Sequence, residues 1–274
     1  MSNLSVRILS SLVGIPLLLA VLWLGDWVML LVVVALGLQS ERELRQFYGA
    51  KSVPFARTWV QSFVVIVPVS LYFSRMDFLT LLGLILILWY AVLLLREIFS
   101  PRPRVLAALG AAFHTGLLCT LPFSSLLALD MLLRPAGVSF RWLLLMLVCI
   151  WAADSFAYFG GRLFGRHKLL ERVSPKKTVE GLLAGLAGAL AVALLVTWRI
   201  DAPQWPAALV LGLLAGLLGP AGDLLESRLK RDAELKDSGA LIPGHGGVLD
   251  RFDSWLLVLP VFYLLVRLGW LPLA

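Results

Sequence analysis

The chain has 274 residues, of which 60% are hydrophobic and only 15% are charged, and its formal net charge is +7. Its mean hydropathy of +0.90 is far above that of a soluble domain and predicts a polytopic membrane protein. A basic chain can bind nucleic acid, but here the Lys and Arg residues lie in short loops between apolar runs, so we expect no nucleic-acid partner.

The apolar runs predict an all-α fold of about nine transmembrane helices. The first run begins near Ile8 and is followed by no small-residue cleavage site, which favours a retained helix over a signal peptide. Prolines in several runs predict tilts and kinks. The predicted spans are residues 8–24, 27–43, 57–74, 77–95, 105–129, 141–161, 178–198, 204–224 and 252–271.

The distribution of basic residues predicts the orientation of these spans. With nine spans, nineteen of the 24 Lys and Arg residues fall on one side of the membrane. Because cytoplasmic loops carry the excess of Lys and Arg, we expect a cytoplasmic N-terminus and an external C-terminus. The two most charged loops, 162–177 and 225–251, then share the cytoplasmic face.

Asp154 lies inside the sixth predicted span, within the segment Trp151–Ser155. An ionisable residue in a membrane span indicates a functional site, because a buried charge there is costly. A structural hydrogen bond to a neighbouring helix is an equally good interpretation, and the sequence leaves both open.

The segment Ser174–Gly181 precedes the seventh predicted span. It combines two lysines, Lys176 and Lys177, with the hydroxyls of Ser174 and Thr178 at a helix start, which is a pattern suited to holding phosphate. The alternative is a basic loop with an ordinary helix cap.

Residues 223 to 253 collect much of the polar chemistry of the chain. Asp223 and Glu226 share one helix face, and Asp250 and Asp253 repeat that spacing at the start of the ninth predicted span. Carboxylate oxygens are the ligands that Mg²⁺ prefers, usually together with substrate phosphates. The glycine-rich segment 243–247 between them allows backbone N–H groups to face an anion.

Each feature of this stretch has a structural alternative. Asp250 can serve as a helix cap, and Asp223 can pair with an arginine for stability. The basic residues can act as topology signals that contact anionic lipid. Their joint occurrence in one short stretch favours a site.

The motifs of this stretch resemble the signature of the phosphatidate cytidylyltransferases, also called CDP-diacylglycerol synthases. The matching runs are SRLKR at 227–231, KDSG at 236–239, PGHGG at 243–247 and DRFD at 250–253. The Ser174–Gly181 segment and the region from Asp154 to Lys168 also resemble this family. Residues 1–150 resemble it only in being polytopic, with Arg7 near the start and an acidic end, Glu41 and Glu43, to the second predicted span.

The resemblance implies transfer of a cytidylyl group from CTP to phosphatidate, which gives CDP-diacylglycerol and pyrophosphate with Mg²⁺ as cofactor. A second cation and a homodimer are compatible with it. We expect one integral membrane domain over 1–274, with N-terminal helices in 1–150 and catalytic helices and cytoplasmic loops in 151–274. The expected location is the bacterial inner membrane, in contact with membrane lipids, with the site on the cytoplasmic side.

The expected site residues form three groups. The catalytic group is Asp223, Asp250, Lys236 and Asp253. The substrate-binding group is Ser174, Lys176, Lys177, Thr178, Ser227, Lys230, Arg231, His245, Gly246, Gly247 and Arg251. The metal ligands are Asp223 and Asp250, with Asp253 and Asp237 as additional or supporting ligands.

Two other functions are weighed against this one. A CTP-dependent lipid kinase would need similar phosphate chemistry but would release CDP instead of pyrophosphate. A transporter or lipid flippase would place polar residues along the middle of several spans, whereas here they gather near one face with Asp154 as the main exception. No DGxxAR run is present, which disfavours a CDP-alcohol phosphotransferase.

Overall fold

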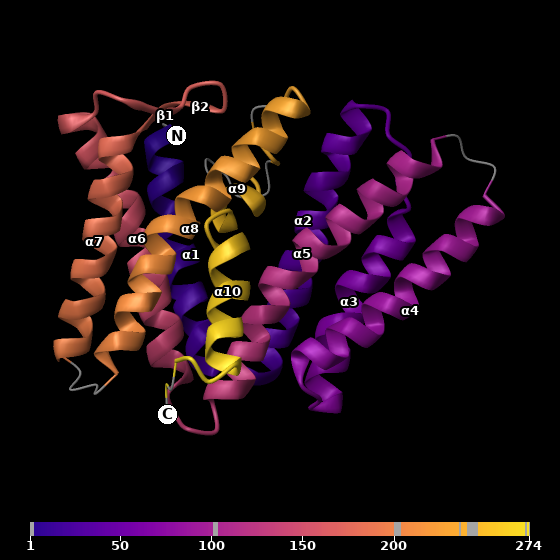
Figure 1. Cartoon of the computed structure of the whole chain (residues 1–274), viewed down its shortest axis with the longest axis horizontal. Helices are drawn as coiled ribbons and strands as arrows, with labels where there is room; N and C mark the ends of the chain where they lie inside the picture. The colour runs from indigo at the N-terminus through magenta and orange to yellow at the C-terminus, as the bar shows by residue number, and fades with distance from the viewer. Residues whose placement is uncertain are drawn as a thin grey trace. The chain divides into compact units, whose positions relative to one another are not determined.

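Helices dominate the protein. The computed structural model describes residues 3–100, 104–199, 204–235, 237–239, 246–271 and 273 (Figure 1). The helices in this part are α1 (Asn3–Leu24), α2 (Asp26–Ala50), α3 (Arg57–Ser74), α4 (Phe78–Ile98), α5 (Val105–Leu133), α6 (Ser139–Phe164), α7 (Val179–Arg199), α8 (Trp205–Asp232), α9 (Leu249–Phe252) and α10 (Trp255–Arg267). The first eight apolar runs therefore contain long helices, as the sequence predicts.

The chain divides into two compact units. Unit 1 comprises Met1–Ala128 and Asp232–Arg251, and unit 2 comprises Leu129–Arg231 and Phe252–Ala274. Each unit therefore combines an earlier part of the chain with a segment from the region that carries the signature motifs. The division into 1–150 and 151–274 that the sequence suggests stays a prediction.

In unit 1, successive helices pack against one another, α1 on α2, α2 on α3 and α3 on α4. Gly37 lets α2 approach its neighbours closely, because a Cβ there would lie 2.8 Å from Cγ1 of Val64 on α3 and 3.2 Å from the carbonyl oxygen of Cys119 on α5. Phe63 and Trp89 form an aromatic contact with ring centroids 4.7 Å apart. The close approach at Gly37 packs α2 against α3 and α5 one turn before Glu41.

In unit 2, α6 and α7 form the most extensive helix contact and run side by side (Figure 1). Small residues make this possible. A Cβ on Gly185 would lie 2.7 Å from the carbonyl oxygen of Ala153, and one on Gly160 would collide with Ala184. Close backbone approach at small residues is the usual way for helices to pack in lipid. The two helices therefore form a rigid wall for the site.

A short β-hairpin connects α6 to α7, where the sequence predicts only a loop. Strand β1 (Lys168–Leu170) pairs antiparallel with β2 (Ser174–Thr178), and the register places Lys168 opposite Thr178. The strands are too short, and β2 too polar, to show the alternation that marks a strand in sequence. The hairpin lies at one end of α6 and α7 (Figure 1).

The ninth predicted span, 252–271, is wrong as one continuous helix. The short α9 ends at Phe252, and α10 runs only from Trp255 to Arg267. Between them, the Asp253 side chain accepts a hydrogen bond from the backbone N–H of Ser254 at 2.6 Å. Asp and Ser side chains compete with helical hydrogen bonding in this way, which explains the interruption.

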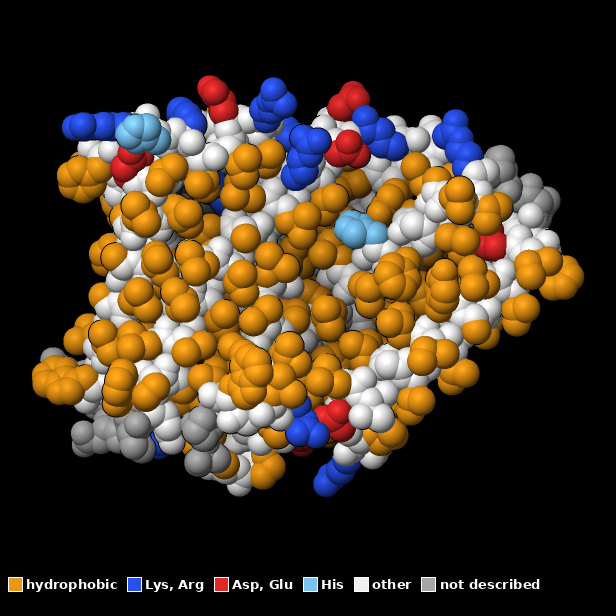
Figure 2. Space-filling view, viewed as in Figure 1, with side chains coloured by type: hydrophobic (Ala, Val, Ile, Leu, Met, Phe, Trp, Pro, Cys, Tyr) orange, Lys and Arg blue, Asp and Glu red, His pale blue; other side chains and the backbone are white. Residues whose placement is uncertain are grey.

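Five helices of the described part are long and apolar enough to cross a membrane, namely α4 to α8. Over unit 2, Figure 2 shows hydrophobic side chains along the helices and charged side chains gathered at the end that carries the hairpin. Large apolar residues such as Leu163 and Leu183 are exposed at 71% and 59%, as expected for lipid-facing positions. The protein is thus a helical integral membrane protein.

Candidate functional site

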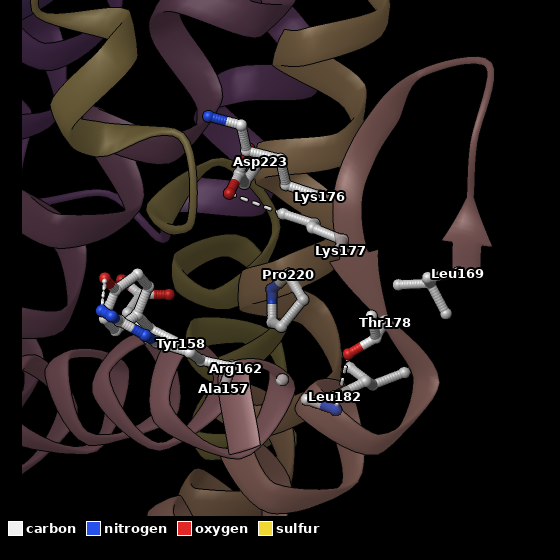
Figure 3. A pocket seen from close by; sticks show the side chains of 13 residues that line it. Ala157, Tyr158, Arg162, Leu169, Lys176, Lys177, Thr178, Leu182, Pro220 and Asp223 are labelled. Atoms are coloured by element: carbon white, nitrogen blue, oxygen red, sulfur yellow. Dashed lines mark hydrogen bonds and ion pairs between the residues drawn. The ribbon is translucent and has the colours of Figure 1, made fainter. Parts of the chain in front are cut away.

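Unit 2 contains a cavity of about 510 Å³ between α6, the hairpin, the start of α7 and the second half of α8 (Figure 3). Its wall is partly apolar, and its charged side chains come from three different elements. The lining residues are Asp154, Ala157, Tyr158, Gly161, Arg162, Leu169, Lys176, Lys177, Thr178, Gly181, Leu182, Pro220 and Asp223. Four predicted site residues, Lys176, Lys177, Thr178 and Asp223, are therefore brought together here.

Lys177 and Asp223 form an ion pair in the cavity (Figure 3). The Lys177 Nζ lies 2.5 Å from Oδ2 of Asp223, and both side chains are partly exposed. The other carboxylate oxygen, Oδ1, accepts a hydrogen bond from the Ser227 hydroxyl at 3.2 Å, one turn further along α8. The pair places a cationic hydrogen-bond donor, Lys177, beside a carboxylate that can bind a metal ion, Asp223. Phosphate chemistry with a metal ion requires both kinds of group.

The hairpin is anchored to α7 through Glu180 and Thr178. Oε2 of Glu180 accepts hydrogen bonds from the backbone N–H groups of Arg166 and His167, at 3.0 and 3.2 Å. The buried Thr178 hydroxyl accepts a hydrogen bond from the Gly181 N–H at 3.1 Å, which caps the start of α7. These contacts hold both ends of the hairpin, and so Lys176 and Lys177 are presented from a fixed base.

Thr178 also lies at one end of the close contact between α6 and α7. A Cβ on Gly161 would lie 2.9 Å from the Thr178 hydroxyl oxygen, and one on Gly181 would lie 2.8 Å from the Ala157 carbonyl oxygen. The helix-cap interpretation of the Ser174–Gly181 segment is therefore correct for Thr178. It does not exclude a role in phosphate binding for the two lysines, which line the cavity.

Two polar residues of the cavity, Tyr158 and Arg162, were not predicted as site residues from the sequence. The role of a third, Asp154, was left open. Arg162, in the last turn of α6, donates a hydrogen bond to the Tyr158 hydroxyl at 3.2 Å (Figure 3). Asp154 lies two turns earlier on the same helix and lines the same cavity. The spacing 154, 158, 162 puts all three on one helix face, and this periodicity was the available signal.

Three carboxylates of unit 2, Asp154, Asp223 and Asp253, lie close enough to influence one another, and two of them are predicted magnesium ligands. Burial raises the pKa of Asp253 to about 7, and the nearby carboxylates Asp223 and Asp154 act in the same direction. Within the described residues, no three His, Cys, Asp or Glu side chains are arranged to hold a metal ion. Mg²⁺ typically takes one or two carboxylates and completes its shell with water and phosphate oxygens, so Asp223 and Asp253 fit an ion that is bound together with its substrate.

Asp250 belongs to unit 1 and is part of a hydrogen-bonded loop. Its Oδ2 accepts from the Ser238 N–H at 3.0 Å, the Ser238 hydroxyl at 2.8 Å and the Gly247 N–H at 2.8 Å. Gly246 has φ +82°, a conformation that favours glycine. Asp250 is therefore not simply a helix cap, since it closes a loop across twelve residues of sequence.

Of the remaining predicted residues, those that the structure describes fall outside these two clusters. Lys230 pairs with the buried Glu226 one turn earlier on α8, at 2.5 Å. Arg231, Asp237 and Arg251 are exposed, and Ser174 is half-buried at the start of β2. Lys236 and His245 lie outside the described residues. Asp237 and Asp250 fall in unit 1 and Asp223 and Asp253 in unit 2, so a metal site shared by all four stays a prediction.

Comparison with known proteins places the whole chain in one family. The model of the Cytidylyltransferase family matches residues 5–269. A phosphatidate cytidylyltransferase of Synechocystis is 36% identical over 96% of both chains. One from Brucella abortus is 34% identical over 96% of this chain and 93% of its own, and one from Staphylococcus haemolyticus is 31% identical over 95% and 98%. The chain therefore belongs to the cytidylyltransferase family.

Proposed function

We propose that the protein transfers a cytidylyl group from CTP to phosphatidate for phospholipid biosynthesis. The observation that carries this proposal is the cavity of unit 2, where Lys176 and Lys177 meet Asp223 and Asp154 at the charged end of apolar helices. The near full-length similarity to phosphatidate cytidylyltransferases supports the same reaction. A polar cavity with a partly apolar wall suits a substrate that has both a phosphate and acyl chains.

In this reaction, a phosphate oxygen of phosphatidate attacks the α-phosphorus of CTP. The bond from the α-phosphorus to the bridging oxygen breaks, and pyrophosphate leaves with the electron pair. The nucleophile is already anionic, so the chain needs no strong general base. Its main tasks are to align the two phosphates and to reduce the repulsion between them.

The residues of the cavity suit these tasks. Lys176, Lys177 and Arg162 supply positive charge for the phosphates. Asp223, supported by Asp253, would hold Mg²⁺, which supplies charge neutralisation at the reacting phosphates. Asp250 and Asp237 are proposed as further ligands, and a second cation remains part of the proposal.

We further propose nine membrane spans with the N-terminus in the cytoplasm and the C-terminus outside. The bias of Lys and Arg toward one set of loops supports this orientation. The hairpin and the loop at 237–251 would then face the cytoplasm, where CTP is found, at the inner membrane of a bacterium. A homodimer is compatible with this arrangement.

The decisive experiment incubates the purified protein with CTP labelled on the cytidine, phosphatidate and Mg²⁺. We expect a labelled lipid together with an equal amount of pyrophosphate, and no product without phosphatidate or with EDTA. Release of CDP in place of pyrophosphate would identify a lipid kinase instead. Diacylglycerol in place of phosphatidate is the matched control, because it has the same acyl chains but lacks the attacking phosphate.

A further inference from the structure

Glu43, near the C-terminal end of α2, is a buried carboxylate far in sequence from the signature motifs. Its side chain lies in unit 1 with only 1% of the residue exposed. A buried carboxylate is costly unless hydrogen bonds compensate the loss of water. The partners of Glu43 therefore indicate what the residue is for.

Four donors converge on the Glu43 carboxylate. Oε1 accepts from the Val248 N–H at 2.9 Å and from the Gln39 side chain at 3.0 Å. Oε2 accepts from the Leu249 N–H at 2.9 Å and from the Ser238 hydroxyl at 3.0 Å. Three of the four donors belong to the segments that flank the glycine-rich signature.

The same segments carry the hydrogen bonds of Asp250. The Ser238 hydroxyl lies within hydrogen-bond distance of both Glu43 and Asp250, and so it bridges the two carboxylates. A Cβ on Gly247 would collide with Ser238 and with Glu43, which shows how closely the loop lies against α2. The loop thus has one carboxylate on either side of Ser238.

We propose that Glu43 is a positioning residue for the reaction, which fixes residues 246–250 and thereby aims the Asp250 carboxylate. The inference depends on the proposed function, in which Asp250 contributes to binding the metal ion. A carboxylate that accepts two adjacent backbone N–H groups sets the direction of the peptide planes that lead into Asp250. Groups that orient a metal ligand in this way commonly affect metal affinity or activity as strongly as some ligands do.

The test compares Glu43→Gln with Glu41→Gln. Glutamine keeps the size of Glu43 but offers an NH₂ group to backbone N–H donors. Glu41 is a matched control because it is also fully buried on α2. It accepts a hydrogen bond from Gln61 and pairs with Arg45 at 3.4 Å, and neither partner belongs to the loop.

We expect Glu43→Gln to raise the Mg²⁺ concentration for half-maximal activity on the order of 10- to 100-fold, and Glu41→Gln to leave it unchanged. Glu43→Asp, which restores the charge, should recover part of the loss. An unchanged Mg²⁺ requirement in Glu43→Gln would overturn the proposal. So would equal loss of activity in both glutamine variants in parallel with their unfolding midpoints.

A second readout needs no catalysis. Hydrogen–deuterium exchange of the amides of Gly247, Val248 and Leu249 should accelerate at least tenfold in Glu43→Gln and stay at the wild-type rate in Glu41→Gln. Slow exchange in both variants would show that Glu43 does not hold the loop. If Glu43→Gln fails to accumulate, Ser238→Ala removes the bridging hydroxyl and should shift both readouts in the same direction, and wild-type values there would equally overturn the proposal.

The two readouts also separate this inference from the proposed function. A wild-type protein that forms no CDP-lipid would contradict the function, whereas the exchange rates would still decide whether Glu43 fixes the loop.

Discussion

Asp223 and Lys177 illustrate how a single contact can satisfy both a structural and a functional interpretation. The sequence left open whether Asp223 pairs with an arginine or binds a metal ion, and the structure has it paired instead with a lysine that is itself predicted to bind phosphate. In a partly exposed pair such as this one, the contribution to stability is at most about 1 kcal/mol. A large functional effect of substitution therefore cannot be explained by the stability that the ion pair contributes.

We predict that Asp223→Asn reduces kcat by more than about 100-fold while the unfolding midpoint in detergent changes little. The reason is that asparagine keeps the shape of the side chain but removes its charge. Turnover is measured as CDP-lipid formed per purified protein. Glu171→Gln, at the exposed turn of the hairpin, should behave as wild type. Near-normal turnover of Asp223→Asn would remove it from the proposed metal site.

Sequence reasoning at this scale finds residues with a chemical motif and misses those without one. Asp223, Lys176 and Lys177 are identifiable because they interrupt apolar sequence or lie in a recognisable run. Glu43 sits in the polar segment SERELRQ, where several acidic and basic residues look equivalent. Only the fold of unit 1 shows which of them meets the loop, because that contact joins residues more than 190 positions apart.

At the scale of elements, the long helices are predictable and their interruptions are not. Apolar length specifies where helices occur, since a spanning segment must satisfy its backbone internally. The hairpin at 168–178 and the break at Asp253 and Ser254 depend on side chains that bond to nearby backbone, such as Glu180 and Asp253. Such local competition leaves no periodic signal in the sequence.

The close contact of α6 with α7 predicts that replacing a glycine in this contact destabilises the protein, whereas replacing a helix glycine outside it does not. Gly185→Ala should lower the free energy of unfolding by about 1–3 kcal/mol, because the added Cβ would meet the Ala153 backbone, which cannot rotate away. Gly110→Ala is the matched control. It also lies within a helix, but nothing lies within 4 Å of an added Cβ, and it should be neutral or slightly stabilising. Thermal unfolding of the purified variants in detergent measures both, and equal midpoints would contradict the packing argument.

For the whole molecule, the open question is the orientation in the membrane. The helix α6 has 26 residues, and at about 1.5 Å per residue it exceeds the roughly 30 Å hydrocarbon core of a bilayer. The loop before it and the hairpin after it should therefore emerge on opposite sides. The orientation can be tested by labelling introduced cysteines, because the two native cysteines are buried and should not react.

We predict that Glu171→Cys reacts with a membrane-impermeant maleimide only in inverted vesicles, and that Ala136→Cys reacts in intact cells. Both positions are exposed and flank α6. This outcome follows from a cytoplasmic hairpin, as the charge bias predicts. Labelling of both positions from one side would contradict a transmembrane α6, and the opposite pattern would reverse the orientation. The unsubstituted chain should remain unlabelled.

The glycine-mediated contact between α6 and α7 also limits how a lipid can reach the cavity. Where Gly185 meets Ala153 and Gly160 meets Ala184, the two backbones leave no room for an acyl chain to pass. A diacylated substrate that diffuses in the bilayer must therefore come around this helix pair and not between its members. The contact between α6 and α7 thus closes one side of the cavity to lipid. A lipid can enter only from the other sides.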